Sequence, residues 1–194
     1  ANAFATARVV LCQLENNLDA VSVALALGRE HRLLCLLNPA PMHPQLDAVL
    51  LRDVDVLTPN EHEFAMLHER AGRHVGVDEI AALADAGLHA LCRELGVPTL
   101  VVTLGERGVF VSHADATVRG DAQTHYRVAA ERVNPIDTTG AGDAFSGALA
   151  AALAARLPFR EAVIHANRAA ALSTERRGTA AAMPTRAEVE AQFR

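Results

Sequence analysis

The sequence predicts an α/β fold, a three-layer αβα sandwich built around a mainly parallel sheet. Short runs rich in leucine and β-branched residues alternate with longer, alanine-rich stretches whose apolar residues have helical spacing. The connections between them are short, and the apolar runs are continuous rather than interrupted by alternating polar residues. Continuous apolar strands separated by helices are typical of a parallel sheet that is covered on both faces.

The expected strands are short apolar runs bounded by polar, proline or glycine residues. They are RVVLCQL (8–14), LLCLL (33–37), VDVLT (54–58), TLVVTL (99–104) and GVFVSH (108–113). Pro39 and Pro59 stop the second and third runs, because proline cannot donate to a strand ladder. Residues 114–133 are polar and irregular, with a possible strand near Tyr126.

The expected helices are longer and carry apolar residues at helical spacing. They cover residues 19–31, 46–52, 60–69, 78–95, 140–155, 159–174 and 185–193. Asn60 stands where a helix cap is expected, and Gly28 lies near the end of the first helix. No repeat, low-complexity linker or internal boundary is visible, so we expect residues 1–194 to form a single domain.

Composition excludes several classes of function. The chain is 51% hydrophobic and 21% charged with a net charge of −5, so no basic field favours nucleic acid or anionic lipid. No uncharged apolar run reaches the roughly 18 residues of a membrane span. Three separated cysteines in apolar settings, Cys12, Cys35 and Cys92, argue against a disulfide framework or a metal site, and weakly favour the cytoplasm.

The start of the chain is unusual. It begins at Ala1, without an initiator methionine, and runs almost directly into the strand expected at residues 8–14. Because domains rarely open on a core strand, we expect the chain to be a piece of a longer protein.

The glycine turn in NPIDTTGAGDAFSG (134–147) directly precedes an expected helix. The first N–H groups of a helix lack internal partners, and glycines at 140 and 142 let an anion such as a transferring phosphate approach them. Asp143, in the first turn, could then accept a proton from an attacking hydroxyl. Helix capping explains a lone Asp there equally well. The chain has no lysine for a Walker A loop, and Phe145 breaks a GxGxxG pattern.

Several motifs together resolve this ambiguity, because DTTGAGDAFSGAL (137–149) resembles the signature of the ribokinase (PfkB-type) family of sugar and nucleoside kinases. LNPAP (37–41), TPNEHE (58–63) and TLGERG (103–108) resemble further motifs of that family, in its order, and RRG (176–178) falls at its last nucleotide and cation loop. The resemblance spans roughly residues 8–193. It implies a ribokinase-like fold and ATP-dependent phosphorylation of a sugar hydroxyl, with ribose the favoured substrate.

The resemblance assigns catalytic and nucleotide-side roles. Asp143 would be the base that activates the sugar hydroxyl, and the N–H groups of Gly140, Ala141, Gly142 and Asp143 would form an anion hole. Glu63 would lie near Mg²⁺, through water, and Asn60 near the triphosphate, although Asn60 alone is also a plain helix cap. The remaining residues expected to contact the nucleotide are Thr103, Gly105, Glu106, Arg107, Gly108 and Asn167. Asn167 alone is weak support, since it lies in an alanine-rich helix.

The resemblance also implies a monovalent cation, K⁺, beside the anion hole. Asp137 would supply a carboxylate, and backbone oxygens of Thr139, Ser173, Arg176 and Gly178 would complete the site. Family members commonly carry serine where Ala182 stands here, so one side-chain oxygen is missing from this pattern.

Substrate identity is less constrained. Glu15 falls where ribokinases bind the sugar, but Asn16 and Asn17 replace the residues usual beside it. Relatives are longer, and we expect the absent part to precede Ala1 and to carry the first strands, a sugar-gripping segment and a β lid. Bare sheet edge there would favour a homo-oligomer, such as a dimer in the full-length protein.

Two classes of function therefore compete. One is a carbohydrate kinase present as its C-terminal part, with an adenosine-type kinase as a variant that the NPAP segment disfavours. The other is a non-catalytic nucleotide-binding or interaction module derived from such a kinase.

Overall fold

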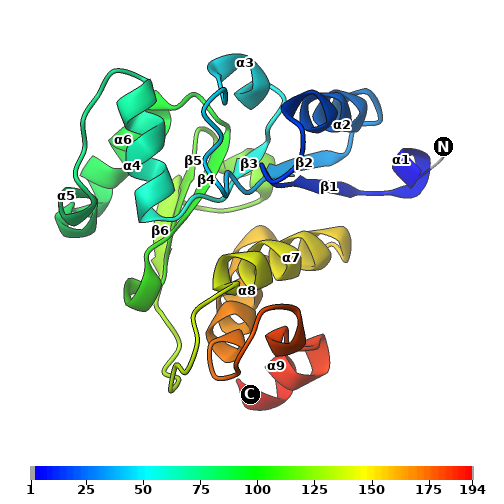
Figure 1. Ribbon diagram of the computed structural model, residues 1–194, viewed down its shortest axis with the longest axis vertical. Helices are drawn as coiled ribbons and strands as arrows, with labels where there is room; N and C mark the ends of the chain where they lie inside the picture. The colour runs from blue at the N-terminus through cyan, green and yellow to red at the C-terminus, as the bar shows by residue number, and fades with distance from the viewer. Residues whose placement is uncertain (1–2, 194) are drawn as a thin grey trace.

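A computed structural model describes residues 3–193 and contains one six-stranded sheet (Figure 1). Its strands lie side by side in chain order: β1 (Val9–Cys12), β2 (Leu34–Leu37), β3 (Val56–Leu57), β4 (Thr99–Thr103), β5 (Val109–His113) and β6 (His125–Val128). The pairings from β1 to β4 are parallel, whereas β4–β5 and β5–β6 are antiparallel. The strand expected near residue 126 is therefore present, as the antiparallel edge of the sheet.

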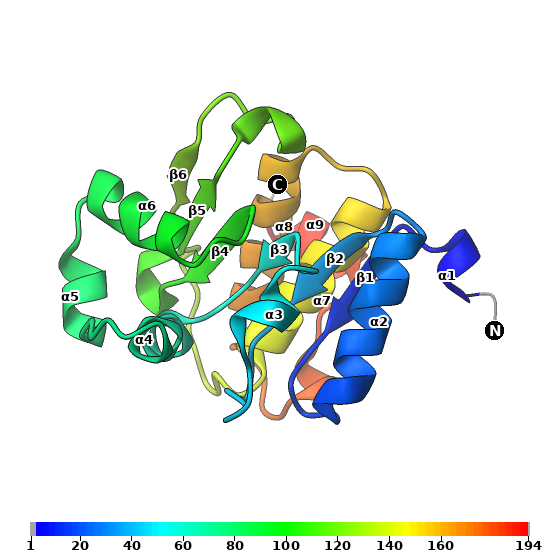
Figure 2. The same cartoon turned by 90° about the horizontal axis from the view of Figure 1, so that it is seen from above.

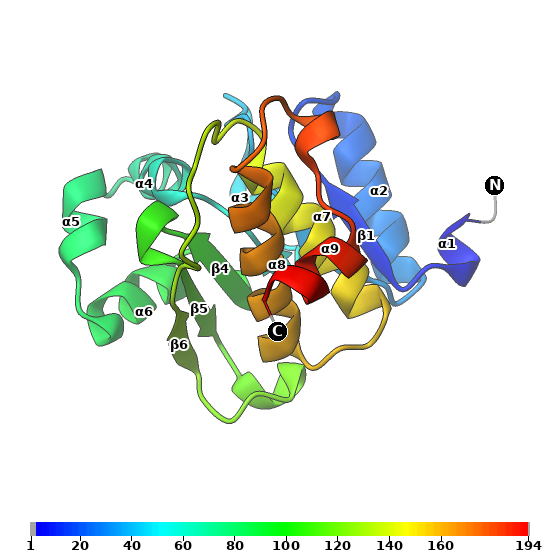
Figure 3. The same ribbon diagram turned by 90° about the horizontal axis from the view of Figure 1, so that it is seen from below.

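Helices cover both faces of the sheet, as Figures 1 and 3 show. The first set is α1 (Ala3–Thr6), α2 (Leu18–Glu30), α3 (Ala48–Leu51), α4 (Glu61–Arg70), α5 (Val77–Ala82) and α6 (Asp85–Glu94). The second set is α7 (Ala141–Ala154), α8 (Phe159–Ser173) and α9 (Arg186–Gln192), and short 3₁₀ turns are η1 (Gly105–Arg107), η2 (Ala116–Arg119) and η3 (Ala180–Ala182). Helices α2 to α6 lie on one side of the sheet and α7 to α9 on the other, which confirms the predicted αβα sandwich.

The two faces of the sheet bury separate cores. On β2, Cys35 and Leu37 join the core beneath α2 to α6, while Leu36 between them joins the core beneath α7 and α8. All three side chains are fully buried. Successive strand residues point to opposite faces, so a strand that is covered twice must be apolar at every position. This is why the strands read as continuous apolar runs.

One predicted element is wrong. Residues 78–95 form two helices, α5 and α6, rather than one. Leu83 and Ala84 break the helix with extended backbone, at ψ 138° and 155°. The acidic Asp85 then lies in the first turn of α6, where it favours a new helix start. Alanine-rich spacing continues across this break, so periodicity alone did not reveal it.

Strand β1 forms one edge of the sheet, and its four residues are all only partly buried. The three cysteines are free; two of them, Cys35 and Cys92, are buried as small apolar side chains, and Cys12 on β1 is half-buried. Burial raises the pKa of the Cys35 thiol to about 11 and that of Cys92 to about 12. Between residues 3 and 193 the longest helix is α8 with 15 residues, and none is long and apolar enough to cross a bilayer.

His68 on α4 is a buried imidazole without a hydrogen-bond partner among the described residues. Its ring packs edge-on against Phe64 at a centroid distance of 4.7 Å. Burial is the main cause that lowers its pKa below 6.5; the Glu94 carboxylate opposes this shift.

We predict that His68→Leu makes the protein less sensitive to acid. Above pH 6.5 the imidazole is neutral in both the folded and the unfolded state. Below pH 6.5 the unfolded chain takes up a proton before the folded protein does, because the folded-state pKa is lower. The free energy of unfolding therefore falls by up to about 1.4 kcal/mol per pH unit until the pH reaches the folded-state pKa. The fall in Tm between neutral pH and pH 5 should therefore be smaller in the variant. The exposed His74→Leu is the control, and an unchanged fall in His68→Leu would contradict this role.

Candidate active site

The candidate site lies at the edge of the sheet where the parallel strands end (Figure 2). Gln13 follows β1, Thr58 follows β3, and Thr103 ends β4. Helix α7 begins at this same edge, and two side-chain contacts join it to the strand ends: Gln13 donates to Asp143, and the hydroxyls of Thr58 and Ser146 lie 3.3 Å apart. Ligands of parallel α/β sheets gather at this edge, because helices begin here with unpaired N–H groups.

Gly140 shapes the start of α7. It is the N-terminal cap and has a φ of 80°, a left-handed conformation that side-chain-bearing residues rarely adopt. The Ala141 N–H donates to the Thr138 carbonyl at 3.2 Å, so it is already engaged. Within residues 3–193, the N–H groups of Gly142 and Asp143 donate to no protein acceptor. A Cβ at Gly142 would have no atom within 4 Å, so open space lies beside these free donors.

Asp143 presents an exposed carboxylate in the first turn of α7. Its Oδ1 accepts a hydrogen bond from the Gln13 amide, which ties the carboxylate to the end of β1 across 130 residues of chain. Its negative charge also reaches Glu63, whose pKa it raises together with burial. Asp143 is thus oriented by the end of one strand.

Asn60 and Glu63 form a reciprocal capping box at the start of α4. The Asn60 side chain accepts from the Glu63 N–H, and Glu63 Oε2 accepts from the Asn60 N–H, both at 2.9 Å. Burial is the largest cause that raises the Glu63 pKa, and the Asn60 hydrogen bond opposes it. Both residues therefore have a structural task, and Glu63 keeps Oε1 available beside Asp143.

The glycine turn between β4 and β5 lies next to this capping box. Thr103 pairs with Asn60 through an isolated parallel bridge, and its N–H donates to the Pro59 carbonyl at 3.0 Å. Gly105, Glu106 and Arg107 form the exposed turn η1, with Arg107 4.0 Å from Glu61.

Gly108 closes this turn at a φ of 79°, and a Cβ there would meet the Val128 carbonyl oxygen at 2.0 Å. Asn167 is buried on α8 and donates to the Ala129 carbonyl at 2.8 Å. Gly108 and Asn167, from two distant parts of the sequence, thus both contact residues 128–130.

Two of the residues expected around a cation, Thr139 and Gly178, meet at Asp137. Its carboxylate accepts the Thr139 N–H and the Gly178 N–H, each at 3.0 Å, which ties the loop before α7 to the loop after α8. These hydrogen bonds, those to Thr139 first, lower the pKa of Asp137 to about 2. A carboxylate that is ionised at any working pH is well suited to a cation.

Ser173 and Arg176 are less open. The Ser173 hydroxyl donates to the Ala170 carbonyl at 2.7 Å, and the Ser173 carbonyl accepts from the Arg176 N–H at 3.3 Å. The Arg176 side chain is paired with Glu188 at 2.7 Å. Ala182 is buried and has no side-chain oxygen to offer.

Glu15 is exposed in the bend after β1, two residues beyond Gln13. No hydrogen bond or ion pair of its side chain is present among the described residues. Glu15 therefore lies where the parallel strands end, as the candidate site does, and its carboxylate is available to a ligand.

Gln13 is the site residue that the sequence reasoning missed. The sequence does carry a signal for Gln13, because it is a polar residue directly after an apolar run. The family resemblance pointed instead to Glu15, two residues later. Thr58 and Ser146 were missed for a similar reason, because they are buried and lie inside motifs whose charged members stand out.

No group of three or more His, Cys, Asp or Glu side chains able to hold a metal occurs among residues 3–193, so a divalent ion here would depend on phosphate and water ligands.

Comparison with known proteins places this chain among relatives of similar sequence and fold. Ribokinase of Schizosaccharomyces pombe is 31% identical over 188 residues, which are 97% of this chain and 55% of that protein. The crystal structure of ribokinase from Thermotoga maritima matches 98% of this chain and 58% of that one, with a TM-score of 0.79 and 29% identity. Arabidopsis thaliana ribokinase, solved with ribose and ATP, has a TM-score of 0.80 and 25% identity over 97% of this chain and 56% of that one.

The chain spans about half the length of the curated relatives that it matches. The model of the pfkB family carbohydrate kinases matches residues 1–186. This match covers nearly the whole sequence and includes every motif that converges at the sheet edge. The chain therefore belongs to the pfkB family of carbohydrate kinases.

Proposed function

We propose that this chain carries the catalytic base and the nucleotide site of an ATP-dependent sugar kinase, with ribose as the favoured acceptor. The single observation that carries the proposal is the start of α7, where the Asp143 carboxylate lies beside the free N–H groups of residues 142 and 143. A base next to an anion hole is what phosphoryl transfer to a hydroxyl requires.

In the proposed reaction, a sugar hydroxyl gives its proton to the Asp143 carboxylate as its oxygen attacks the γ-phosphorus of ATP. A new P–O bond to the sugar forms, and the bond between the γ-phosphorus and the β,γ-bridging oxygen breaks, so ADP leaves. The N–H groups of Gly142 and Asp143 stabilise the charge on the transferring phosphoryl group, helped by the positive end of the α7 dipole. Gln13 holds the Asp143 carboxylate in place through its amide.

The residues present fit a divalent ion on the nucleotide side. Glu63 lies in the first turn of α4, and its Oε1 takes no part in the capping box. Mg²⁺ would neutralise phosphate charge there, and Glu63 would hold it through water. Asp137 and the carbonyls of the 173–178 loop would hold K⁺, and the low pKa of Asp137 keeps that carboxylate charged.

Glu15 is the proposed sugar-binding carboxylate, because it is exposed at the same edge as Gln13. That the Arabidopsis relative was solved with ribose and ATP supports both substrates. Strand β1 is an edge strand, so its outer side is open to pairing with a further strand or with a second copy of the protein. We propose a homodimer that works in the cytoplasm.

A second candidate function is a nucleotide-binding module without turnover. It is favoured by the length of the chain, which is about half that of its relatives. Because both candidates share the nucleotide site, only turnover separates them.

Asp143→Asn should lower kcat for ribose phosphorylation by about 10² to 10⁴-fold in the protein that contains this chain, because amide nitrogen cannot accept the hydroxyl proton. The dissociation constant of ADP should change by less than about threefold, since the backbone N–H groups remain. Coupled detection of ADP gives the first quantity and calorimetry the second.

Asp78→Asn is the matched control for Asp143→Asn, because Asp78 is also an exposed carboxylate in a first helical turn, at α5. It should leave kcat unchanged. Equal kcat in Asp143→Asn and the parent would remove Asp143 from its role as base. ADP binding without any phosphorylation of ribose would instead favour the second candidate.

Asp137→Asn should weaken activation by K⁺. The variant loses the only side-chain charge at the proposed cation site, so the K⁺ concentration for half-maximal activity should rise by about tenfold. Asp115→Asn is the control, because that carboxylate also accepts two hydrogen bonds, both of them from Thr117, but lies before η2. An unchanged response to K⁺ in Asp137→Asn would show that the cation site lies elsewhere.

A further inference from the structure

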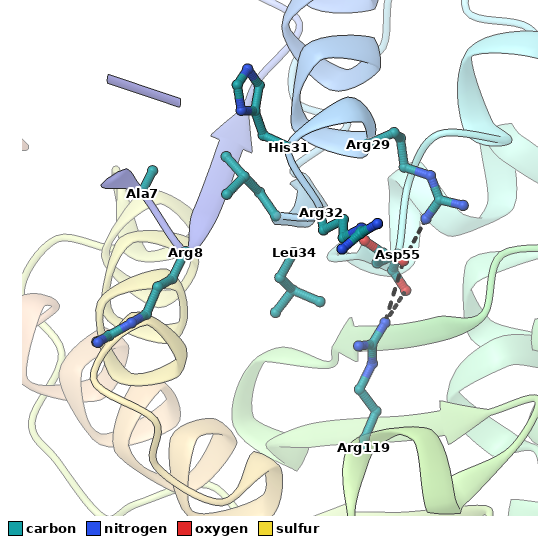
Figure 4. A pocket seen from close by; sticks show the side chains of 9 residues that line it. Ala7, Arg8, Arg29, His31, Arg32, Leu34, Asp55 and Arg119 are labelled. Carbon is teal, nitrogen blue, oxygen red and sulfur yellow. Dashed lines mark hydrogen bonds and ion pairs between the residues drawn. The ribbon is translucent and has the colours of Figure 1, made fainter. Parts of the chain in front are cut away.

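A second polar pocket lies at the edge of the sheet opposite to Asp143, where the parallel strands begin. It has a volume of about 700 Å³. Arg8 precedes β1, Asp55 precedes β3, Arg29 and Arg32 lie at the end of α2, and Arg119 ends η2. These side chains come from segments far apart in sequence and line one hollow (Figure 4).

Asp55 organises the middle of this pocket. Its Oδ1 lies 3.0 Å from Arg29 Nη1 and 3.7 Å from Arg119 Nη2, and its Oδ2 accepts the Cys35 N–H at 2.9 Å. Only 12% of the Arg119 side chain is exposed, so its guanidinium is held rather than mobile. Figure 4 shows Arg29, Arg32 and Arg119 gathered around this one carboxylate.

The positive charges in the pocket exceed the negative one. Four arginines and one aspartate are among the residues that line it, with a net charge of +3 in a chain whose total is −5, although the Arg8 guanidinium points away from Asp55 (Figure 4). The Arg8 Nη1 donates to the Ala154 carbonyl at 2.8 Å, a neutral partner. The Arg32 side chain makes no hydrogen bond or ion pair with any of residues 3–193. Such uncompensated guanidinium groups bind phosphate oxygens, often through two parallel hydrogen bonds.

The other residues that line the pocket indicate which kind of ligand fits it. Only Leu33 and Leu34 are large and apolar, and Leu33 is buried. A nucleobase would find little surface on which to pack, whereas a compact, multiply charged anion would meet guanidinium groups from several sides. The chemistry therefore favours a small phosphate compound over a nucleotide.

We propose that this pocket binds a small phosphate-bearing anion, such as pyrophosphate or a phosphate monoester, through Arg32 together with Arg29 and Arg119. The site is separate from the proposed nucleotide site, which lies at the other edge of the sheet. It rests on the charges and geometry of its own residues and does not depend on kinase activity.

Arg32 offers a sharp test because its backbone has a φ of 57°, a left-handed conformation that glycine adopts without strain. Arg32→Gly therefore removes the guanidinium without straining the fold, and Tm should not fall. We expect pyrophosphate, titrated into the whole chain by calorimetry at constant ionic strength, to bind about tenfold more weakly or worse to this variant, as loss of a charge-assisted hydrogen bond implies.

Arg156→Gly is the matched control. Arg156 has a φ of 66° just after α7 and does not line the pocket. Its removal makes the same backbone change and the same change in net charge. At physiological salt, charge outside the pocket is largely screened, so pyrophosphate affinity should stay within about twofold of the parent.

Asp55→Asn should have the opposite effect. It removes the one negative charge but keeps an oxygen that can accept from Cys35, so affinity for pyrophosphate should rise several-fold. The proposal is overturned if pyrophosphate does not bind the parent, if Arg32→Gly and Arg156→Gly bind it equally, or if Asp55→Asn, folded by its Tm, binds it no more tightly. Binding to anionic vesicles without binding of free pyrophosphate would also overturn it.

Discussion

The site depends on where helix α7 begins. Gly140 takes up a left-handed backbone conformation, so the chain turns sharply and leaves the N–H groups of residues 142 and 143 free at the sheet edge. The hydrogen bond from Gln13 to Asp143 then fixes the first turn of α7 against the end of β1. Without that contact the carboxylate would be one more exposed side chain in a first helical turn, with no defined position relative to the strands.

The sandwich explains why distant motifs meet there. Strands β1 to β4 are parallel, so each ends at the same edge, and each following segment starts there. The capping box at residues 60 and 63 and the turn at 105–108 are placed by this rule. The loops around residues 137 and 178 lie on the other face, and the Asp137 carboxylate joins them through two backbone N–H groups. Arg8 and Asp55 precede their strands, so the same rule places the arginine pocket where the parallel strands begin, at the opposite end from the candidate site.

The layers, nearly all elements and the position of the glycine turn could be predicted from the sequence, because continuous apolar strands and capping residues are local signals. The break at Leu83 and Ala84 could not, because helical spacing persists across it. Gln13 was missed since its partner is 130 residues away and only the fold brings them together. The helix cap at Asn60 was predicted, but the structural task of Asn167 was hidden, because its hydrogen bond to the Ala129 carbonyl leaves no pattern in the sequence. The arginine pocket has the same origin, since four separate segments supply it.

The central claim is that the start of α7 is an anion site beside a base, and a crystal structure of this chain with ADP tests it most directly. The account predicts the β-phosphate of ADP at the start of α7, next to the position that the transferring phosphoryl group would occupy beside the Gly142 and Asp143 N–H groups, with the nucleoside extending toward the turn at residues 105–108. ADP bound with its phosphates away from α7, or a chain that binds no ADP at concentrations well above those of ordinary nucleotide sites, would contradict it.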